Sequence, residues 1–347
     1  YRNRPVQRNP NRDFQLMSRV LEFEGNRHEF EKPMRIISEY DVPEDAWFFQ
    51  QNSHPQWMPY SVLMEIALQP CGFISANSGA MLIYPELDLH YRNLDGNGIL
   101  SKHIDLRGKT IQAEVELYST VASGNTVIQK HRFILKCEGL PFYEGDTVFG
   151  YFTDEALENQ TGLDGGKAKL PWLDENTNHD MKIYRLNDSN SGLESGKPHL
   201  KLAGNQLNLL DEVHLSPSVG SHGKGYAYGK RIVDPKDWFF PCHFHQDPVM
   251  PGSLGVEAIL QALQVFCLDQ KLGDSFSNPR FRPSLSQTRW KYRGQIIPTT
   301  GMMQLELHVS KIEKQDDQLM LVADASLWRD ELRIYEVQNI SLVIEEA

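Results

Sequence analysis

The feature that most constrains this chain is an internal repeat with a period of about 190 residues. Residues 42–49, which end in Trp-Phe-Phe, return as residues 233–240, and each copy leads through a polar, histidine-containing stretch to Met-Pro. Six residues after each proline stands a glutamate and four residues later a glutamine: Glu65 and Gln69, then Glu257 and Gln261. Five landmarks in one order exceed coincidence, and the period is too long for a solenoid. The sequence therefore predicts a duplicated domain.

Each half continues with the same pattern after its Met-Pro. Residues 63–71 and 254–268 are mostly apolar all round, which predicts a buried helix. Segments rich in β-branched and alternating apolar residues follow and are typical of strands: residues 110–118, 126–136, 302–309 and 318–327. This order predicts an α+β fold in which a sheet wraps around a central helix, twice over. Pro70 should end or bend the first helix early.

The repeat divides the chain into four parts. We expect a linker remnant over residues 1–24, cut from a longer polypeptide, and a first domain over 25–156. Residues 157–205 are dense in Gly, Asn, Asp and Ser and are predicted to be an inter-domain linker, part of which packs down at Trp172. The second domain is expected over 206–347.

Charge and cysteine usage narrow the class of protein. The formal net charge of −11 argues against nucleic-acid binding, which needs a basic face. No run approaches the roughly 20 apolar residues of a membrane span, and no apolar core follows the basic N-terminus, so neither a span nor a signal peptide is predicted. The four cysteines lie far apart, which favours reduced thiols in a cytoplasmic protein over disulfides.

The densest cluster of reactive side chains lies in residues 237–257, and three interpretations compete there. A metal site is disfavoured because adjacent residues of one short loop rarely converge on one ion; its ligands would be Cys242, His243, His245 and Asp247. The histidines could instead be structural, held by local backbone. The third interpretation is acid–base catalysis by a histidine that faces a carboxylate.

Acid–base catalysis is favoured for a physical reason. Gly252 and Ser253 precede the buried helix, so its unpaired N–H groups and positive dipole end lie near His243, where they can polarise a carbonyl oxygen. Glu65 and Glu257 each lie about one turn into an otherwise apolar helix. Burial raises the pKa of a carboxyl group, as a general acid requires, although each glutamate could also be a structural hydrogen-bond partner.

The second half resembles the β-hydroxydecanoyl-(acyl carrier protein) dehydratase/isomerase family of bacterial fatty-acid synthesis. The resemblance covers about residues 206–347 and runs through Gly-Tyr at 225–226, the motif at 238–257 and Arg-Gly-Gln-Ile-Ile-Pro at 293–298. It implies a hot-dog fold. It also implies a dimeric arrangement in which one subunit supplies the histidine and the other the acidic residue.

Carried over to this chain, the resemblance assigns the catalytic histidine to His243 and the carbonyl-binding amide to Gly252. The acidic position falls on Glu257. Ser253 stands in place of a cysteine, while Gln246 replaces a glycine and His245 an apolar residue. These last two departures bear on the shape of the substrate channel.

The first half resembles the family only weakly. Counted back from Met-Pro, the position of His243 falls near Gln51 or Asn52, and Tyr60 stands where Gly252 stands; His54 is a local alternative. If the halves pair as the family's subunits do, His243 faces Glu65 and Glu257 faces a degenerate site. This fused arrangement resembles the dehydratase domains of polyunsaturated fatty acid synthases and implies a double hot-dog fold.

The resemblance implies dehydration of β-hydroxyacyl thioesters, with double-bond isomerisation left open. His243 would remove the α-proton and Glu65 would protonate the departing hydroxyl. Secondary candidates for the site are Glu257, Gln69, His245 and His54. No metal or other cofactor is expected. The implied partners are an acyl carrier protein with phosphopantetheine-linked acyl chains and the neighbouring domains of a megasynthase. Two rival functions stay open: a hot-dog thioesterase and a non-catalytic docking scaffold for the carrier protein.

Overall fold

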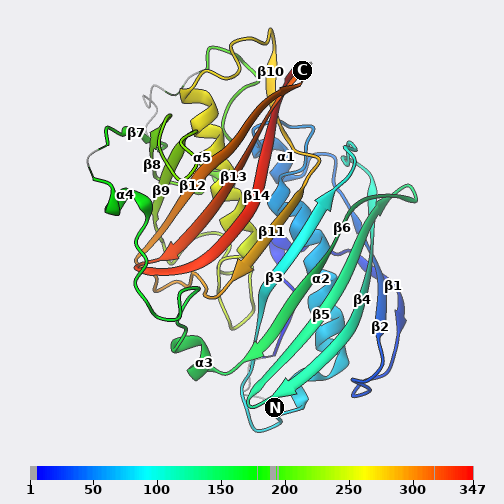
Figure 1. Cartoon of the computed structure of the whole chain (residues 1–347). Coiled ribbons are helices and arrows are strands. Elements are labelled where there is room, and N and C mark those ends of the chain that lie inside the picture. The colour runs from blue at the N-terminus through cyan, green and yellow to red at the C-terminus, as the bar shows by residue number, and fades with distance from the viewer. Residues whose placement is uncertain (1–5, 178, 188–192, 194, 316, 347) are drawn as a thin grey trace.

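Figure 1 presents the computed structural model, which describes residues 6–177, 179–187, 193, 195–315 and 317–346. The first half contains two helices and six strands: β1 (Arg19–Glu24), β2 (Met34–Asp41), α1 (Trp47–Gln51), α2 (Tyr60–Ser78), β3 (His90–Leu100), β4 (Thr110–Ser123), β5 (Thr126–Cys137) and β6 (Leu140–Phe152). The second half contains the following elements: β8 (Glu212–Ser216), β9 (Tyr226–Ile232), α5 (Gly252–Asp269), β10 (Pro279–Pro283), β11 (Gln287–Tyr292), β12 (Met302–Gln315), β13 (Gln318–Arg329) and β14 (Leu332–Glu346). Between them lie α3 (Asp154–Glu158), α4 (Trp172–Glu175) and β7 (Lys182–Arg185).

One antiparallel sheet runs through both halves. Its strands follow the order β1-β2-β4-β5-β6-β3-β11-β14-β13-β12-β9-β8-β7, and β10 pairs with β14 beside this path. Apart from β7, the first-half order β1-β2-β4-β5-β6-β3 has its counterpart in β8-β9-β12-β13-β14-β11, read from the opposite end of the sheet. The two halves meet where β3 pairs with β11. The duplication seen in the sequence is therefore present as an approximate two-fold relation in the sheet.

Each half of the sheet curves around one long helix (Figure 1). Helix α2 packs against β2, β4 and β5, while α5 packs against β9, β12 and β14, and the two helices also contact each other. Strands β4, β5 and β13 alternate between buried and exposed positions, so their apolar side chains face the helix. Because both helices are apolar nearly all round, this burial on all sides stabilises them. The predicted α+β arrangement of sheet around helix is present.

Helix α2 is longer than the sequence led us to expect. It continues through Pro70 to Ser78 and ends at Gly79, whose φ of 81° gives the left-handed cap that glycine favours. A proline inside a helix removes one hydrogen bond and costs about 3 kcal/mol. The burial of α2 against the sheet outweighs that cost, so the expectation of a helix shortened at Pro70 is wrong.

The segment predicted to be a linker remnant over residues 1–24 belongs in large part to the first half. A short 3-10 helix, Arg12–Phe14 (η1), precedes β1, which pairs with β2. Its counterpart is a second 3-10 helix, Asn205–Leu207 (η3). Both begin at a residue with positive φ, Arg12 and Asn205. The repeat thus starts near residue 12, and sequence reasoning missed this because the two segments share almost no residues.

Matched hydrogen bonds hold these two segments. Trp47 Nε1 donates to the Asp13 carbonyl at 2.9 Å, and Trp238 Nε1 donates to the Gln206 carbonyl at 3.0 Å. The repeated glutamines act in the same way, since the side-chain oxygen of each accepts a backbone N–H at 2.9 Å: Gln69 from Leu16 and Gln261 from Leu209. The rings of Trp47 and Trp238 meet edge to face at 5.1 Å. The repeated Trp-Phe-Phe motifs therefore lie together where the halves join.

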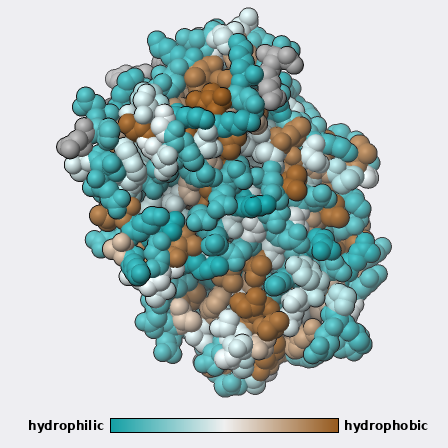
Figure 2. Space-filling model, in the orientation of Figure 1, coloured by the Kyte–Doolittle hydropathy of each residue, from teal (hydrophilic) through white to brown (hydrophobic). Residues whose placement is uncertain are grey.

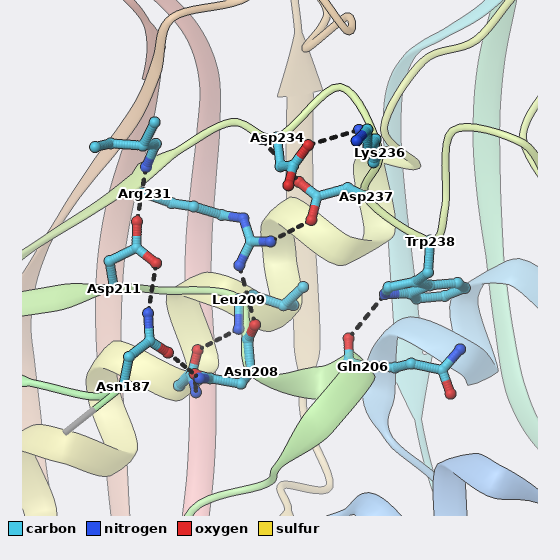
Figure 3. A network of polar contacts seen from close by, with 12 residues as sticks. Asn187, Gln206, Asn208, Leu209, Asp211, Arg231, Asp234, Lys236, Asp237 and Trp238 are labelled. Carbon is cyan, nitrogen blue, oxygen red and sulfur yellow. Dashed lines mark hydrogen bonds and ion pairs between the residues drawn. The ribbon is translucent and has the colours of Figure 1, made fainter. Parts of the chain in front are cut away.

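The described part of residues 157–205 is attached to the second half. Strand β7 pairs with β8. Part of the segment packs down at Trp172 as predicted: its ring contacts Tyr226, and its backbone N–H donates to Glu306 at 2.6 Å. Figure 3 shows the polar network just after this segment, where Arg231 donates to the Asn208 carbonyl at 3.1 Å and pairs with Asp237 beside Trp238. The segment connects the halves and also lies against the second one.

The outer surface is mixed in polarity. On the face drawn in Figure 2 hydrophilic residues predominate, and apolar ones form separate patches. Among the described residues, no helix is long and apolar enough to cross a membrane. All four cysteines are free and buried.

Candidate active site

His243 lies in the loop between the second Trp-Phe-Phe motif and α5. The buried side chains of Phe239 and Phe240 anchor the start of this loop, and the His243 N–H donates to the Phe239 carbonyl at 2.9 Å. The ring Nδ1 lies 2.9 Å from the Val249 carbonyl. A carbonyl can only accept, so Nδ1 carries the proton and Nε2 is left with a free lone pair. This tautomer is the one that a base acting through Nε2 requires.

The surroundings of His243 keep its ring neutral. Burial lowers its pKa to about 4, and the positive charge of Arg92 acts in the same direction. The hydrogen bond to Val249 opposes this effect without cancelling it. At neutral pH the imidazole is therefore uncharged and can accept a proton.

Glu65 lies on α2, in the other half of the chain, and its carboxyl group is buried. Its Oε1 accepts a hydrogen bond from the Ser253 hydroxyl at 2.7 Å, and Gln69 Nε2 lies 3.5 Å from Oε2. Burial raises the pKa of Glu65 to about 7, although these two hydrogen bonds act in the opposite direction. Near neutral pH a large fraction of this carboxyl group is protonated and can donate a proton.

Gly252 and Ser253 form the first turn of α5. Their backbone N–H groups have no helical carbonyl four residues earlier to donate to. These N–H groups therefore form the positive end of the α5 dipole. A Cβ atom on Gly252 would lie 2.6 Å from Cε2 of Tyr292, whose ring covers this turn. Glycine is therefore needed here for the packing of an aromatic ring.

One cavity brings these groups together across the two halves. Its walls include the following residues: Glu65, His243, Gly252, Ser253, Tyr292 and Tyr335. It extends along α2 past Gln69 to Gly72, and the segment 7–10 forms part of its wall. Gln7 donates to the Gly72 carbonyl at 2.9 Å, which holds this segment on α2. Sequence reasoning missed the contribution of residues 7–10, since they fell in the expected linker.

Gln69 has a structural role in addition to its place in the cavity wall. Besides accepting the Leu16 N–H, its amide donates to the Phe14 carbonyl at 2.9 Å. These bonds tie the N-terminal segment to α2. The amide therefore holds the wall of the cavity near Glu65.

Glu257 lies away from this cavity. It lines a second, smaller cavity together with Asn52 and Tyr60, and its Oε2 accepts the Ser61 N–H at 3.0 Å. Burial raises its pKa as well. Gln51, the alternative counterpart of His243, is occupied by hydrogen bonds with Gln206. The second cavity thus holds a carboxyl group without a histidine in its wall.

Two further histidines from the sequence analysis lie outside both cavities. His54 is buried, its Nδ1 accepts the Gln56 N–H at 3.2 Å, and burial lowers its pKa to about 4. His245 is exposed to solvent. Among the described residues no group of three or more His, Cys, Asp and Glu side chains is placed to hold a metal ion.

Comparisons with known proteins agree with the resemblance predicted for the second half. Residues 202–338 match the family of the FabA-like domain. Over 320 residues the chain is 37% identical to one of the polyunsaturated fatty acid synthase polypeptides of Thraustochytrium sp.. This match covers 89% of the chain and 21% of the relative, so the chain spans about a fifth of that protein's length.

Solved structures align with the chain at low sequence identity, and one of them has a TM-score above 0.5. An isomerase-inactive variant of GphF DH1 aligns with a TM-score of 0.51 and 12% identity over 98% of each chain. The dehydratase domain from the CurJ module of curacin polyketide synthase aligns with a TM-score of 0.47 and 12% identity over 96% of each chain.

Proposed function

We propose that this chain, whose residues 202–338 match the FabA-like domain family, dehydrates β-hydroxyacyl thioesters to trans-2-enoyl thioesters. The observation that carries the proposal is the shared cavity, in which a neutral histidine and a protonated carboxyl group lie beside a helix N-terminus. A base, an acid and a dipole that polarises a carbonyl are the groups that elimination of water from a thioester needs.

In the proposed reaction the thioester carbonyl accepts hydrogen bonds from the first turn of α5 at Gly252, which makes the α-proton more acidic. His243 Nε2 takes that proton, and the electron pair of the broken Cα–H bond forms the Cα–Cβ double bond. The Cβ–O bond breaks as the Glu65 carboxyl group gives its proton to the hydroxyl, and water leaves. His243 then carries the substrate's α-proton, Glu65 is left as a carboxylate because its proton has gone into the water, and exchange with solvent restores both groups.

The fold we infer is a double hot-dog made of residues 12–156 and the described residues of 205–346, joined by the segment between them. The mirrored strand order and the two central helices support it. Only the second half would supply a histidine, whereas the first would supply the acid. One working site per chain follows, because Glu257 lies in a cavity without a histidine in its wall.

The thioester would be carried on the phosphopantetheine arm of an acyl carrier protein within a multidomain synthase. The named relative, of which this chain matches about a fifth, supports this setting. No step of the reaction calls for a metal or redox cofactor. If the same histidine also moved the double bond, the enzyme would be an isomerase as well. Formation of a β,γ-enoyl thioester in the same assay would reveal that activity.

The test is the reverse reaction, hydration of a crotonyl thioester, which is monitored by the loss of the enoyl absorbance. Replacing His243 by Ala should lower kcat by about 10²–10⁴-fold, because it removes the base of the proposed reaction. His54→Ala is the matched control, since it removes a buried histidine from the corresponding loop of the first half, and it should keep the wild-type rate.

Three outcomes would overturn the assignment. One is a wild-type rate in His243→Ala. Another is release of free acid from a saturated acyl thioester without hydration activity, which would identify a thioesterase. A wild-type chain that binds acyl carrier protein and turns over neither substrate would point to a docking scaffold.

A further inference from the structure

A buried ion pair links the first half to the loop that carries His243. Arg92 on β3 donates two parallel hydrogen bonds to Asp247, one from each terminal nitrogen and each 2.6 Å long. The two side chains are 10% and 18% exposed, so the pair is largely removed from water. Bidentate pairs of this kind fix both distance and orientation. His90, on the same strand, adds a contact of 3.0 Å between its Nδ1 and Asp247.

Asp247 belongs to the turn that presents the His243 ring. Its carbonyl accepts the Phe244 N–H at 3.0 Å, and its own N–H lies 3.3 Å from the Phe244 carbonyl. Two residues later, the Val249 N–H donates to the His243 carbonyl at 2.8 Å, while the Val249 carbonyl accepts from His243 Nδ1. A carboxylate held at Asp247 therefore fixes the backbone that orients the imidazole.

The other end of the ion pair is equally well fixed. Arg92 also donates to the Tyr91 carbonyl at 2.9 Å and to the side chain of Gln295, and its side chain lines the cavity that holds His243. Burial alone would raise the pKa of Asp247, but the hydrogen bonds from Arg92 and His90 lower it below its usual range. The carboxylate is therefore charged across the whole working pH range.

The corresponding loop of the first half provides an internal comparison. Counted back from Met-Pro, Asp247 corresponds to Pro55, which has no carboxylate. The arginine beside that loop, Arg280 on β10, donates to Gln56 at 3.1 Å and pairs with Glu345 of its own half. The loop that has no counterpart of His243 at the equivalent position thus lacks the charged anchor as well.

We propose that Arg92 is a positioning residue for His243 that acts across the two halves through Asp247. The proposal rests on the dehydratase function proposed above. On this view the first half supplies the acid and also sets the geometry of the base. Loss of the guanidinium fork removes no group that reacts but lets the His243 turn shift, so turnover falls more than binding does.

The test compares Arg92→Gln, Arg92→Lys and Asp247→Asn with Arg280→Gln as the matched control, in the full chain. We expect kcat to fall about 10–100-fold with KM changed less than about twofold, since a misplacement of about 1 Å costs up to about 10²-fold in rate. Arg92→Lys keeps the charge and loses the fork, so it should recover only part of the loss. Arg280→Gln should keep the wild-type kcat.

Two further readouts separate positioning from general destabilisation. The pKa of His243, read from the acidic limb of kcat/KM for dehydration, should rise in Arg92→Gln and fall in Asp247→Asn, because the charge lost has opposite sign. The double variant Arg92→Gln/Asp247→Asn should lose no more than the worse single variant, since both act on one contact. If Arg92→Gln does not fold, Arg92→Lys decides by the same kcat and KM criterion.

Failure of this inference is distinct from failure of the proposed function. A wild-type chain without hydratase activity would overturn the function. An active wild type with unchanged kcat in folded Arg92 variants, or with losses equal to those in Arg280→Gln, would overturn the positioning role.

Discussion

At the scale of single residues, the site works through burial, which acts in opposite directions on two groups. It lowers the pKa of His243 to about 4 and raises that of Glu65 to about 7. The same exclusion of water therefore leaves the base neutral and the acid protonated near neutral pH. Glu65 has one short hydrogen bond, from Ser253, and no cation within contact distance is seen among the described residues, which is why its proton is retained.

A prediction about pH follows from these two values. In the dehydration direction His243 must be unprotonated and Glu65 protonated, so kcat/KM should form a plateau between about pH 4 and about pH 7. Above pH 7 it should fall about tenfold per pH unit. The measurement is kcat/KM for a β-hydroxyacyl thioester from pH 4 to 9, with circular dichroism to confirm that the fold persists. A rate that climbs through pH 7 would contradict the assignment of Glu65 as the acid.

At the scale of elements, the N-terminus of α5 is the part on which the geometry depends most. The ring centroids of Tyr292 and Tyr335 lie 4.2 Å apart with the planes tilted by 40°, and Tyr292 covers the Cα of Gly252. The position of the first N–H groups is thus set by packing between α5 and β11. Its counterpart in α2 begins with Tyr60, whose hydroxyl lies 3.4 Å from that of Tyr143 and whose ring lines the second cavity.

Gly252→Ala tests this packing. The new Cβ would lie 2.6 Å from the Tyr292 ring, so either the ring or the helix start must move. We expect a loss of about 1–3 kcal/mol in stability, typical of overpacking, together with a lower kcat. Thermal unfolding and crotonyl thioester hydration measure the two effects. Gly204→Ala is the control, because nothing lies within 4 Å of its Cβ position; equal behaviour of the two variants would argue against the packing role.

At the scale of the whole molecule, the sequence predicted the repeat and the two buried helices, because these rest on motifs and on apolar runs. The expectation that His243 faces Glu65 came from the family resemblance, and both residues line one cavity. The N-terminal part of the first half, with Asp13 and Leu16, was not accessible, since its role depends on backbone carbonyls and N–H groups. The Arg92–Asp247 pair was missed for a related reason: it depends on where β3 meets the other half.

The central claim is that one site is shared by two unequal halves, with the acid from the first half and the base from the second. Glu65→Gln and Glu257→Gln test it most directly, as each removes one buried carboxyl group from an equivalent helical position. The measurement is kcat for crotonyl thioester hydration in both variants and in the wild type. The account predicts a loss of about 10²–10⁴-fold in Glu65→Gln and a rate within about twofold of wild type in Glu257→Gln. The reverse result, full activity in Glu65→Gln and loss in Glu257→Gln, would contradict it.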